Sequence, residues 1–355
     1  MKIVTIVGAR PQFIKAAPVS RAFSRQSGIV ECILHTGQHY DANMSGVFFE
    51  ELSIPAPAHH LGIGGLSHGA NTGRTIEAIE TVLQDEKPDW VLVYGDTNST
   101  LAGAIAAAKL HIPIAHVEAG LRSFNMRMPE EVNRRLTDHC SSLLFTPCKQ
   151  AGVNLQNEGI AGNNVLNVGD VMYDAVLMFA DMVERRESQL EIFNLERNNY
   201  VLATIHRQEN TDHEDRMIAI MEGLGASPYP VVLPLHPRTR ATMTTMNLQL
   251  PHNIRVVDPL GYLQMIDLER NAALIVTDSG GVQKEAYFHR VPCITLRDET
   301  EWTELVELGW NQLASPSRDD LRAIITAGGT TGRNDVLPYG DGTAADHIAR
   351  AMAQH

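Results

Sequence analysis

Short apolar runs rich in β-branched residues alternate with helix-like stretches along the whole chain, and no other feature of the sequence constrains the fold as strongly. In the first half, the strand-like runs are Lys2–Val7, Val30–Leu34, Trp90–Tyr94, Ile112–His116 and Leu143–Thr146. The helix-like stretches between them are Pro11–Ser24, Gly73–Gln84, Ser99–Leu110 and Glu130–Cys140. Because strands that alternate with helices form parallel sheets with right-handed crossovers, this pattern predicts an α/β fold.

The second half repeats the alternation, and a chain of 355 residues is long enough for two domains that each bury a core. Its strand-like runs are Tyr200–Thr204, Val231–Leu235, Ile254–Val257, Leu274–Thr277 and Cys293–Leu296. We expect two Rossmann-like parallel-sheet domains facing a cleft, over residues 1–168 and 169–335, and a C-terminal segment over 336–355 that ends in a helix. Ligands of such folds bind at the carboxyl ends of the strands.

Composition narrows the classes of partner. The chain carries 29 Lys and Arg against 42 Asp and Glu, a net charge of −13, which argues against a nucleic-acid partner. No apolar run approaches the roughly 20 residues that span a bilayer, and the pattern at the start of the chain predicts a strand. We therefore expect a cytoplasmic protein with no membrane partner. The four cysteines form no CxxC pair and no HExxH occurs, so neither a disulfide nor a metal site is expected.

Two strand-to-helix turns have the chemistry of anion sites. In the first, Gly8 frees the turn after Lys2–Val7, Pro11 opens a helix, and Arg10 adds a forked donor. The segment is neither GxGxxG nor a Walker loop, so it does not favour nicotinamide or ATP. The alternative is a plain structural turn.

The second turn follows Leu274–Thr277 and reads Asp-Ser-Gly-Gly. Ser279, Gly280 and Gly281 open a helix there, which lets the backbone approach a phosphate closely, and Glu285 lies one turn further on, where a carboxylate can accept from ribose hydroxyls. The alternative is a small-residue turn with Glu285 in solvent. Two such turns on opposing domains indicate a diphosphate, as in a nucleotide sugar.

Acidic and histidine side chains also follow predicted strands. Asp96 follows Trp90–Tyr94, Glu118 follows Ile112–His116, and Glu130 opens the next helix. Such carboxylates can act as general acids and bases, although Asp96 could instead cap a helix and Glu130 could serve only as a dipole partner. His206 and His236 follow two strands of the second half, where either could donate to a phosphate or be structural.

Together these segments resemble the non-hydrolysing UDP-N-acetylglucosamine 2-epimerase family. The resemblance runs from Gly8-Ala9-Arg10-Pro11 to Tyr339-Gly340-Asp341-Gly342, and its most specific parts are His116–Arg122, Pro129–Arg134 and Thr277–Glu285. It implies a glycosyltransferase-B-like fold, a homodimer, and a last helix that returns to the first domain. It also implies an isomerase that needs no cofactor and inverts C2 of a UDP-2-acetamido sugar, by eliminating UDP to a 2-acetamidoglycal and adding it back.

The resemblance assigns roles to individual positions. Asp96, Glu118 and Glu130 match the family's catalytic carboxylates, without deciding which of them is the base, and His206 matches the histidine at the leaving diphosphate. The remaining positions match substrate-binding residues: Arg10, Lys15, Arg134, His236, Ser279, Gly280, Gly281 and Glu285.

Departures from the common family pattern point to one branch. The loop 123–128 is short, and Trp302-Thr303 stands where many members have Arg-Pro. Asp41 replaces a glutamine of the family's regulatory site, so we do not expect the substrate to activate the enzyme. These variants resemble the epimerases of UDP-2,3-diacetamido-2,3-dideoxy-glucuronate, which serve surface polysaccharide synthesis, and Arg127 is a candidate partner for the uronate. UDP-N-acetylglucosamine remains the alternative substrate. A hydrolysing epimerase, a retaining glycosyltransferase and a silent nucleotide-sugar sensor are the rival functions.

Overall fold

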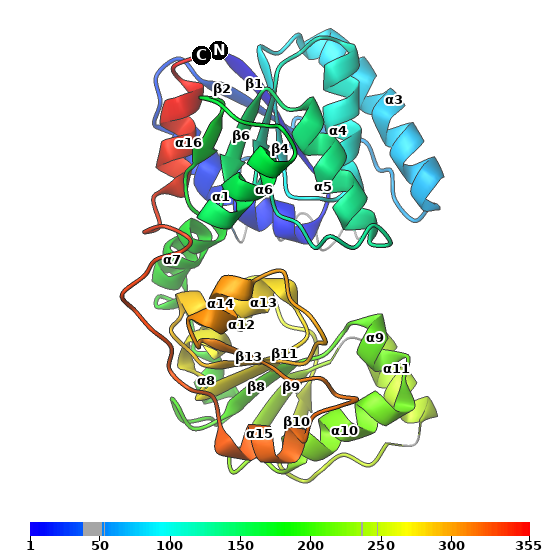
Figure 1. The fold of residues 1–355 in the computed structure, drawn as a ribbon, viewed down its shortest axis with the longest axis vertical. Coiled ribbons are helices and arrows are strands. Elements are labelled where there is room, and N and C mark those ends of the chain that lie inside the picture. Colours follow the sequence, from blue (N-terminus) through cyan, green and yellow to red (C-terminus); the bar gives the residue numbers. More distant parts are fainter. Residues whose placement is uncertain (38–51, 53, 236, 247) are drawn as a thin grey trace. The chain divides into compact units, whose positions relative to one another are not determined.

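The protein is described here by a computed structural model that covers residues 1–37, 52, 54–235, 237–246 and 248–355. The chain divides into two compact units (Figure 1). Unit 1 comprises Met1–Leu177 and Leu337–His355, and unit 2 comprises Met178–Val336. Each unit is built around one parallel sheet, so the two parallel-sheet α/β units expected from the alternating pattern are confirmed.

Unit 1 is built on a seven-stranded sheet with the order β3-β2-β1-β4-β5-β6-β7. Its strands are β1 (Lys2–Val7), β2 (Val30–His35), β3 (His59–His60), β4 (Trp90–Tyr94), β5 (Ile114–Val117), β6 (Leu143–Thr146) and β7 (Val165–Asn167). All neighbours pair in parallel. The direction in which successive strands are added reverses between β1 and β4, and we call this position the switch point of unit 1. In open α/β sheets such a reversal opens a crevice at the carboxyl ends of the strands.

Helices pack on the sheet of unit 1. They are α1 (Arg10–Ser24), α3 (His68–Glu86), α4 (Asn98–Lys109), α5 (Pro129–Cys140), α6 (Lys149–Asn157) and α16 (Ala344–Met352), with α7 (Val171–Val183) running across the division between the units. Small residues let α4 lie close to the sheet, because its buried face is largely alanine. The last helix packs against α1, and Arg25 of that region pairs with Asp346 at 2.5 Å.

Unit 2 repeats the topology of unit 1 in a six-stranded sheet, with the order β10-β9-β8-β11-β12-β13. Its strands are β8 (Val201–Thr204), β9 (Val231–Pro234), β10 (Ile254–Val257), β11 (Leu274–Thr277), β12 (Cys293–Thr295) and β13 (Asn311–Leu313). Its helices are α8 (Gln189–Ile192), α9 (Gln208–Thr211), α10 (Glu214–Gly225), α11 (Pro237–Thr245), α12 (Tyr262–Asn271), α13 (Gly280–Phe288), α14 (Thr303–Glu307) and α15 (Leu321–Ala327). The reversal here falls between β8 and β11.

Separate apolar clusters fill the two sides of the unit 2 sheet, because alternate residues of β8 and β11 point to opposite faces. Val201 and Val276 belong to one cluster, and Leu202 and Ile275 to the other. Strands buried on both faces explain the continuous apolar runs in the sequence. Among the residues that the structure describes, none of the helices combines the length and apolar character that crossing a membrane requires.

Candidate active site

The turn between β1 and α1 is fixed by a buried glutamine. The Gln12 side-chain carbonyl accepts from the backbone N–H groups of Gly8 at 2.8 Å and Ala9 at 3.1 Å. Its amide nitrogen donates to the Tyr94 carbonyl and the Thr100 hydroxyl, both at 2.9 Å. Gln12 therefore joins the two turns that flank the switch point of unit 1. These two N–H groups therefore have a partner within the turn, and Arg10 at the start of α1 is the cationic group of this turn.

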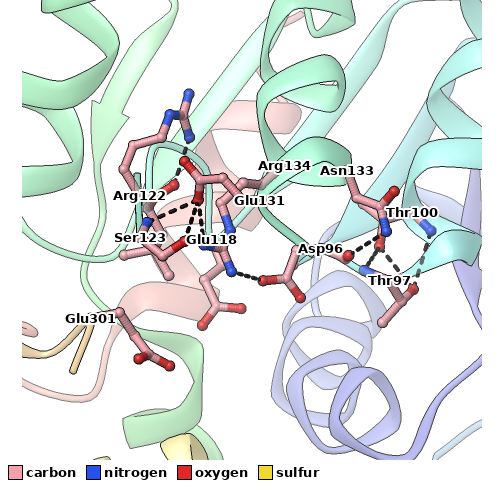
Figure 2. Close-up of polar contacts among 12 residues, drawn as sticks. Asp96, Thr97, Thr100, Glu118, Arg122, Ser123, Glu131, Asn133, Arg134 and Glu301 are labelled. Carbon is pink, nitrogen blue, oxygen red and sulfur yellow. Dashed lines mark hydrogen bonds and ion pairs between the residues drawn. The ribbon is translucent and has the colours of Figure 1, made fainter. Parts of the chain in front are cut away.

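Asp96 lies in the turn between β4 and α4, beside the switch point. Its carboxylate forms an ion pair with Arg134 of α5, and Asn133 donates to its backbone carbonyl at 2.9 Å (Figure 2). The Asp96 side chain is 32% exposed, so one side of the carboxylate remains open to solvent. Burial lowers the pKa of Arg134, but Asp96 and then Glu131 outweigh it and raise the pKa above its usual range. Arg134 is therefore a permanent cation beside Asp96.

Glu118 follows β5 in a backbone conformation that few non-glycine residues adopt, with φ of +71°. Its side chain is almost buried and forms an ion pair with Lys15 of α1. Gly95 lies beside this pair, and a Cβ there would stand 3.1 Å from Glu118 Oε2 and 3.3 Å from Lys15 Nζ, at a φ of +61°. A residue with a side chain would crowd the pair, so glycine at 95 lets the two reach each other. The fold thus brings Lys15 of α1 and Glu118 of the turn after β5 together.

A fully buried network holds the Glu118 turn in place. His116 Nδ1 lies 2.7 Å from Asp138 Oδ1, and His116 Nε2 lies 2.8 Å from the Gly95 carbonyl. Arg122 pairs with the other Asp138 oxygen at 2.7 Å, and the Gly120 N–H donates to that oxygen at 3.1 Å. Burial raises the pKa of Asp138, but His116 and Arg122 outweigh it and lower the pKa below its usual range. The network spans both sides of Glu118 and also reaches the residue before Asp96.

The two glutamates that open α5 have different surroundings. Glu130 is exposed, whereas Glu131 is buried. Glu131 accepts from the Ser123 N–H at 2.9 Å, the Ser123 hydroxyl at 3.0 Å and Arg134 at 2.8 Å (Figure 2). Glu131 therefore orders the loop 123–128 and holds the arginine that pairs with Asp96. The sequence assigned a role to Glu130, and the structure adds Glu131 as the member of the pair that joins the hydrogen-bonded cluster.

In unit 2, the switch point is organised by Asp278, which is fully buried after β11. Its carboxylate accepts from the backbone N–H groups of His206, at 3.1 and 3.2 Å, and of Arg207, at 3.1 Å, both in the turn after β8. Asn210 donates to the same carboxylate at 3.0 Å. His206 Nδ1 lies 3.2 Å from Asp278 Oδ1, while the side chain is 55% exposed. Asp278 thus orients the imidazole and leaves its far side open.

The start of α13 forms the second predicted turn. Ser279 is the N-cap, and its hydroxyl accepts from the Val282 N–H at 3.4 Å. Gly280 and Gly281 follow in the first turn, and Glu285 is buried one turn further along. A Cβ at Gly280 would stand 2.9 Å from Glu301 Oε1, whereas a Cβ at Gly281 would meet only Ser279 Oγ and Glu285 Oε2, at 3.9 and 4.0 Å. Gly281 is exposed and Gly280 is half-buried, at the helix N-terminus, where the first N–H groups have no partner within the helix.

The structure also shows site residues that the sequence did not single out. Gln12, Asp138 and Asp278 are buried polar residues whose partners lie far away in the chain. Of the three, only Asp278 lies in one of the segments that are most specific to the family resemblance, Thr277–Glu285. His236 and Asp41, which the sequence selected, lie outside the described residues.

Comparison with known proteins agrees with this arrangement. A family model for UDP-N-acetylglucosamine 2-epimerase matches residues 21–353. The UDP-2,3-diacetamido-2,3-dideoxy-D-glucuronate 2-epimerase of Pseudomonas aeruginosa is 52% identical over 360 residues, which cover 100% of both chains. The UDP-N-acetylglucosamine 2-epimerase of Methanocaldococcus jannaschii is 44% identical, covering 99% of each.

Solved structures give the same result. The crystal structure of the M. jannaschii enzyme in complex with UDP-GlcNAc and UDP matches with a TM-score of 0.90, at 44% identity and 100% coverage of both chains. The Neisseria meningitidis enzyme bound to UDP-GlcNAc matches with a TM-score of 0.89, at 30% identity and the same coverage. From its sequence, its two parallel sheets and its strand-end residues, the chain belongs to the non-hydrolysing UDP-N-acetylglucosamine 2-epimerase family of isomerases.

Proposed function

We propose that this enzyme inverts C2 of UDP-2,3-diacetamido-2,3-dideoxy-glucuronate in surface polysaccharide synthesis. The observation that carries the choice of sugar is the 52% identity over the full chain to a relative that bears this name. UDP-N-acetylglucosamine is the second candidate, and it is supported by the 44% identity to a relative named for that substrate.

The reaction requires a base and an acid at C2. In the elimination, a carboxylate takes the C2 proton while the C1–O bond breaks and UDP leaves, which gives a 2-acetamidoglycal. In the addition, an acid returns a proton to the other face of C2, and the diphosphate oxygen forms the C1–O bond again. We assign these proton transfers to Asp96, Glu118 and Glu130, without fixing their order. Lys15 and Arg134 form ion pairs with Glu118 and Asp96 and so orient the two carboxylates for proton transfer.

Unit 2 has the chemistry to hold the nucleotide. The N-cap Ser279 and the backbone N–H groups of Gly280 and Gly281 suit the diphosphate, because a helix N-terminus attracts negative charge. Glu285 would accept from ribose hydroxyls. His206, oriented by Asp278, would donate to the departing diphosphate and stabilise its charge. His236 and Arg10 complete the proposed substrate contacts.

Proton NMR in D2O tests the reaction and the sugar together. The enzyme is incubated separately with UDP-N-acetylglucosamine and with its 2,3-diacetamido-glucuronate counterpart. We expect deuterium at C2 and a new manno signal with the uronate only. The same result with UDP-N-acetylglucosamine alone would replace the substrate assignment, and exchange in neither tube would remove the epimerase proposal for both sugars.

Arg127 is the residue to which we assign recognition of the uronate. It lies exposed in the loop 123–128, which Glu131 ties down through Ser123 and through the Phe124 N–H at 3.2 Å. A charge-assisted pair with a carboxylate contributes about 1.5–3 kcal/mol. We expect Arg127→Ala to lower kcat/KM for the uronate at least about tenfold, with UDP binding unchanged. The exposed Arg74→Ala serves as control, and an unaltered kcat/KM in Arg127→Ala would refute this role.

The same family resemblance leads us to propose a cytoplasmic homodimer. Light scattering of the purified enzyme across a range of concentrations tests the oligomeric state. A mass of about 39 kDa at every concentration, which is the mass of one chain, would contradict the dimer.

A further inference from the structure

Three different metal-ligating side chains meet in unit 1, away from the candidate active site. The ligand atoms of Cys32, His59 and Glu86 all lie within 4.8 Å of one another. His59 Nε2 stands 2.5 Å from Glu86 Oε1. Lys2, the first residue of β1, pairs with the other Glu86 oxygen, so the cluster lies at the amino-terminal side of the sheet. The proposed catalytic groups follow the carboxyl ends of the strands.

The fold accounts for this meeting. In the parallel register of β2 and β3, Leu34 lies opposite His59, and Cys32 precedes Leu34 by two residues. Paired residues and residues two apart share one face of a sheet, so Cys32 and His59 point to the same side. That side is covered by α3, whose buried residues pack with Cys32 in one apolar cluster. Glu86 is the last residue of α3, and a helix C-terminus favours a cation.

Burial leaves the cluster accessible from one side. Cys32 is 9% exposed, whereas the side chains of His59 and Glu86 are 32% and 22% exposed. An ion can therefore enter from solvent, and a water molecule can complete its coordination. Lys2 Nζ is held 2.5 Å from Glu86 Oε2, which leaves Oε1 facing His59. Sulfur, imidazole nitrogen and carboxylate oxygen are ligands that Zn²⁺ accepts together, whereas Mg²⁺ and Ca²⁺ require oxygen ligands.

We propose that Cys32, His59 and Glu86 bind one zinc ion with a fourth, open position. On binding, the Cys32 thiol releases its proton to solvent and the sulfur bonds to zinc. The hydrogen bond between His59 Nε2 and Glu86 Oε1 breaks and its proton leaves Nε2, so that the neutral imidazole binds zinc through Nε2 and carries its one proton on Nδ1. The ion ties the two-residue strand β3 to β2 and α3, so its role is to stabilise unit 1. The proposal does not depend on the sugar substrate or on the catalytic assignments.

Titration of the chelator-treated full-length enzyme with Co²⁺ and Zn²⁺ tests the site. We expect one Co²⁺ per chain with a thiolate-to-cobalt absorption band, displacement of Co²⁺ by Zn²⁺, and no displacement by millimolar Mg²⁺. Zinc should raise the unfolding midpoint of the wild type, because a ligand that binds only the folded state stabilises it. Binding of no metal, or a cobalt spectrum without a thiolate band, would overturn the proposal.

Matched variants locate the ion. Cys32→Ser should weaken zinc binding more than about a hundredfold, because replacing even a residue that only hydrogen-bonds to a metal ligand lowers metal affinity about 10–100-fold. Cys140→Ser, a partly buried thiol of the same unit, should bind as the wild type does. If Cys32→Ser does not fold, Glu86→Gln at the accessible edge provides the same test with the thiol intact. Wild-type affinity in Cys32→Ser or Glu86→Gln would place the ion elsewhere and refute the site.

Substitution of Lys2 should change the affinity for zinc in the opposite direction. Its ammonium lies beside the proposed ion and repels it, so Lys2→Gln should tighten zinc binding by roughly tenfold. A variant that merely loosened the fold would weaken binding instead. Weaker or unchanged binding in Lys2→Gln would contradict a cation at this position.

Discussion

At the scale of single residues, the two glutamates at the start of α5 have different expected roles, one in proton transfer and the other in stabilising the fold. Glu130 is exposed, and Glu131 is buried against Arg134 and the loop 123–128. If Glu130 transfers a proton, Glu130→Gln should lower kcat by about 10²–10⁴-fold and leave the unfolding midpoint unchanged. Steady-state kinetics and urea unfolding of the same preparation measure both quantities. Undiminished kcat in this variant would leave proton transfer to Asp96 and Glu118.

The neighbouring substitution should have a different signature. Glu131→Gln removes the charge that faces Arg134 inside the protein, and breaking one partner of a buried ion pair costs about 3–5 kcal/mol. We therefore expect a loss of stability of about 3 kcal/mol together with a lower kcat, because Arg134 also holds Asp96. Unchanged stability in Glu131→Gln would show that the loop 123–128 is held by other contacts.

Residue roles of this kind mark the limit of prediction from sequence. Asp96, Glu118 and Ser279 could be predicted because each follows an apolar run, and the carboxyl ends of parallel strands meet at one edge. Gln12 and Asp278 could not, because they act by bonding to turns 82 and 72 residues away. Likewise, the sequence does not distinguish Glu130 from Glu131, since their difference is one of burial.

At the scale of elements, the long apolar strands were predictable and the short edge strands were not. Five expected runs have the same bounds as the observed strands β1, β4, β6, β10 and β11, whereas β3 and β13 have two and three residues and no apolar run of their own. Helix α3 begins at His68, five residues before the expected Gly73, because its first turn is polar and carries no apolar period. Edge strands depend on pairing with a neighbour, which the local sequence does not encode.

The N-terminus of α13 gives a prediction at this scale. In Gly280→Ala, the new Cβ would stand 2.9 Å from Glu301 Oε1 and would crowd the backbone that we assign to the diphosphate. We expect UDP binding to weaken about tenfold, a change of about 1.4 kcal/mol. Gly281→Ala keeps its N–H and has room for the methyl group, so it should bind UDP within about threefold of the wild type. Calorimetric titration with UDP measures both affinities. An equal loss of UDP affinity in the two variants would contradict a diphosphate site centred on Gly280.

Asp174 of α7 links α7 to the last helix and makes the stability of that link depend on pH. It accepts from the N–H groups of Ala344 at 3.1 Å and Ala345 at 2.8 Å. Burial raises its pKa from 3.8 to about 6, against the lowering effect of these hydrogen bonds. Between pH 3.8 and about 6 the unfolded state therefore binds fewer protons than the folded state, so the free energy of unfolding falls as the pH rises through this window. The difference of about 2.2 between the two pKa values corresponds to about 3 kcal/mol of stability.

Asp174→Asn removes this titration and should flatten the pH profile. Relative to the wild type, we expect the free energy of unfolding of the variant to rise by about 2.5 kcal/mol between pH 4 and pH 7. Urea unfolding at several pH values measures the difference. The exposed Asp346→Asn, in the first turn of α16, controls for a change of charge at the helix end. A constant difference between Asp174→Asn and the wild type would contradict the raised pKa.

At the scale of the whole molecule, the chain consists of two units with separate cores and the same strand order, and each places its polar residues at its own switch point. Unit 1 gathers carboxylates paired with cations, whereas unit 2 gathers an oriented histidine and a helix N-terminus. This division predicts that nucleotide binding and proton transfer can be impaired separately. Variants of Glu118 should lose turnover but retain UDP, and variants at Gly280 should lose UDP first.

Hydrogen exchange with UDP tests this division without substitutions. At UDP concentrations about 100 times Kd, the state that binds it gains about 2.7 kcal/mol. We expect slower exchange of core amides of unit 2, such as Leu202 in β8 and Val276 in β11, because their strands lead directly into the His206 and Ser279 turns. The amide of Val93 in β4 of unit 1 should change little, since UDP lacks the sugar on which the carboxylates act. Equal protection of Val93 and Val276 would show that UDP alone engages both units, and the nucleotide contacts would then have to be reassigned to include unit 1.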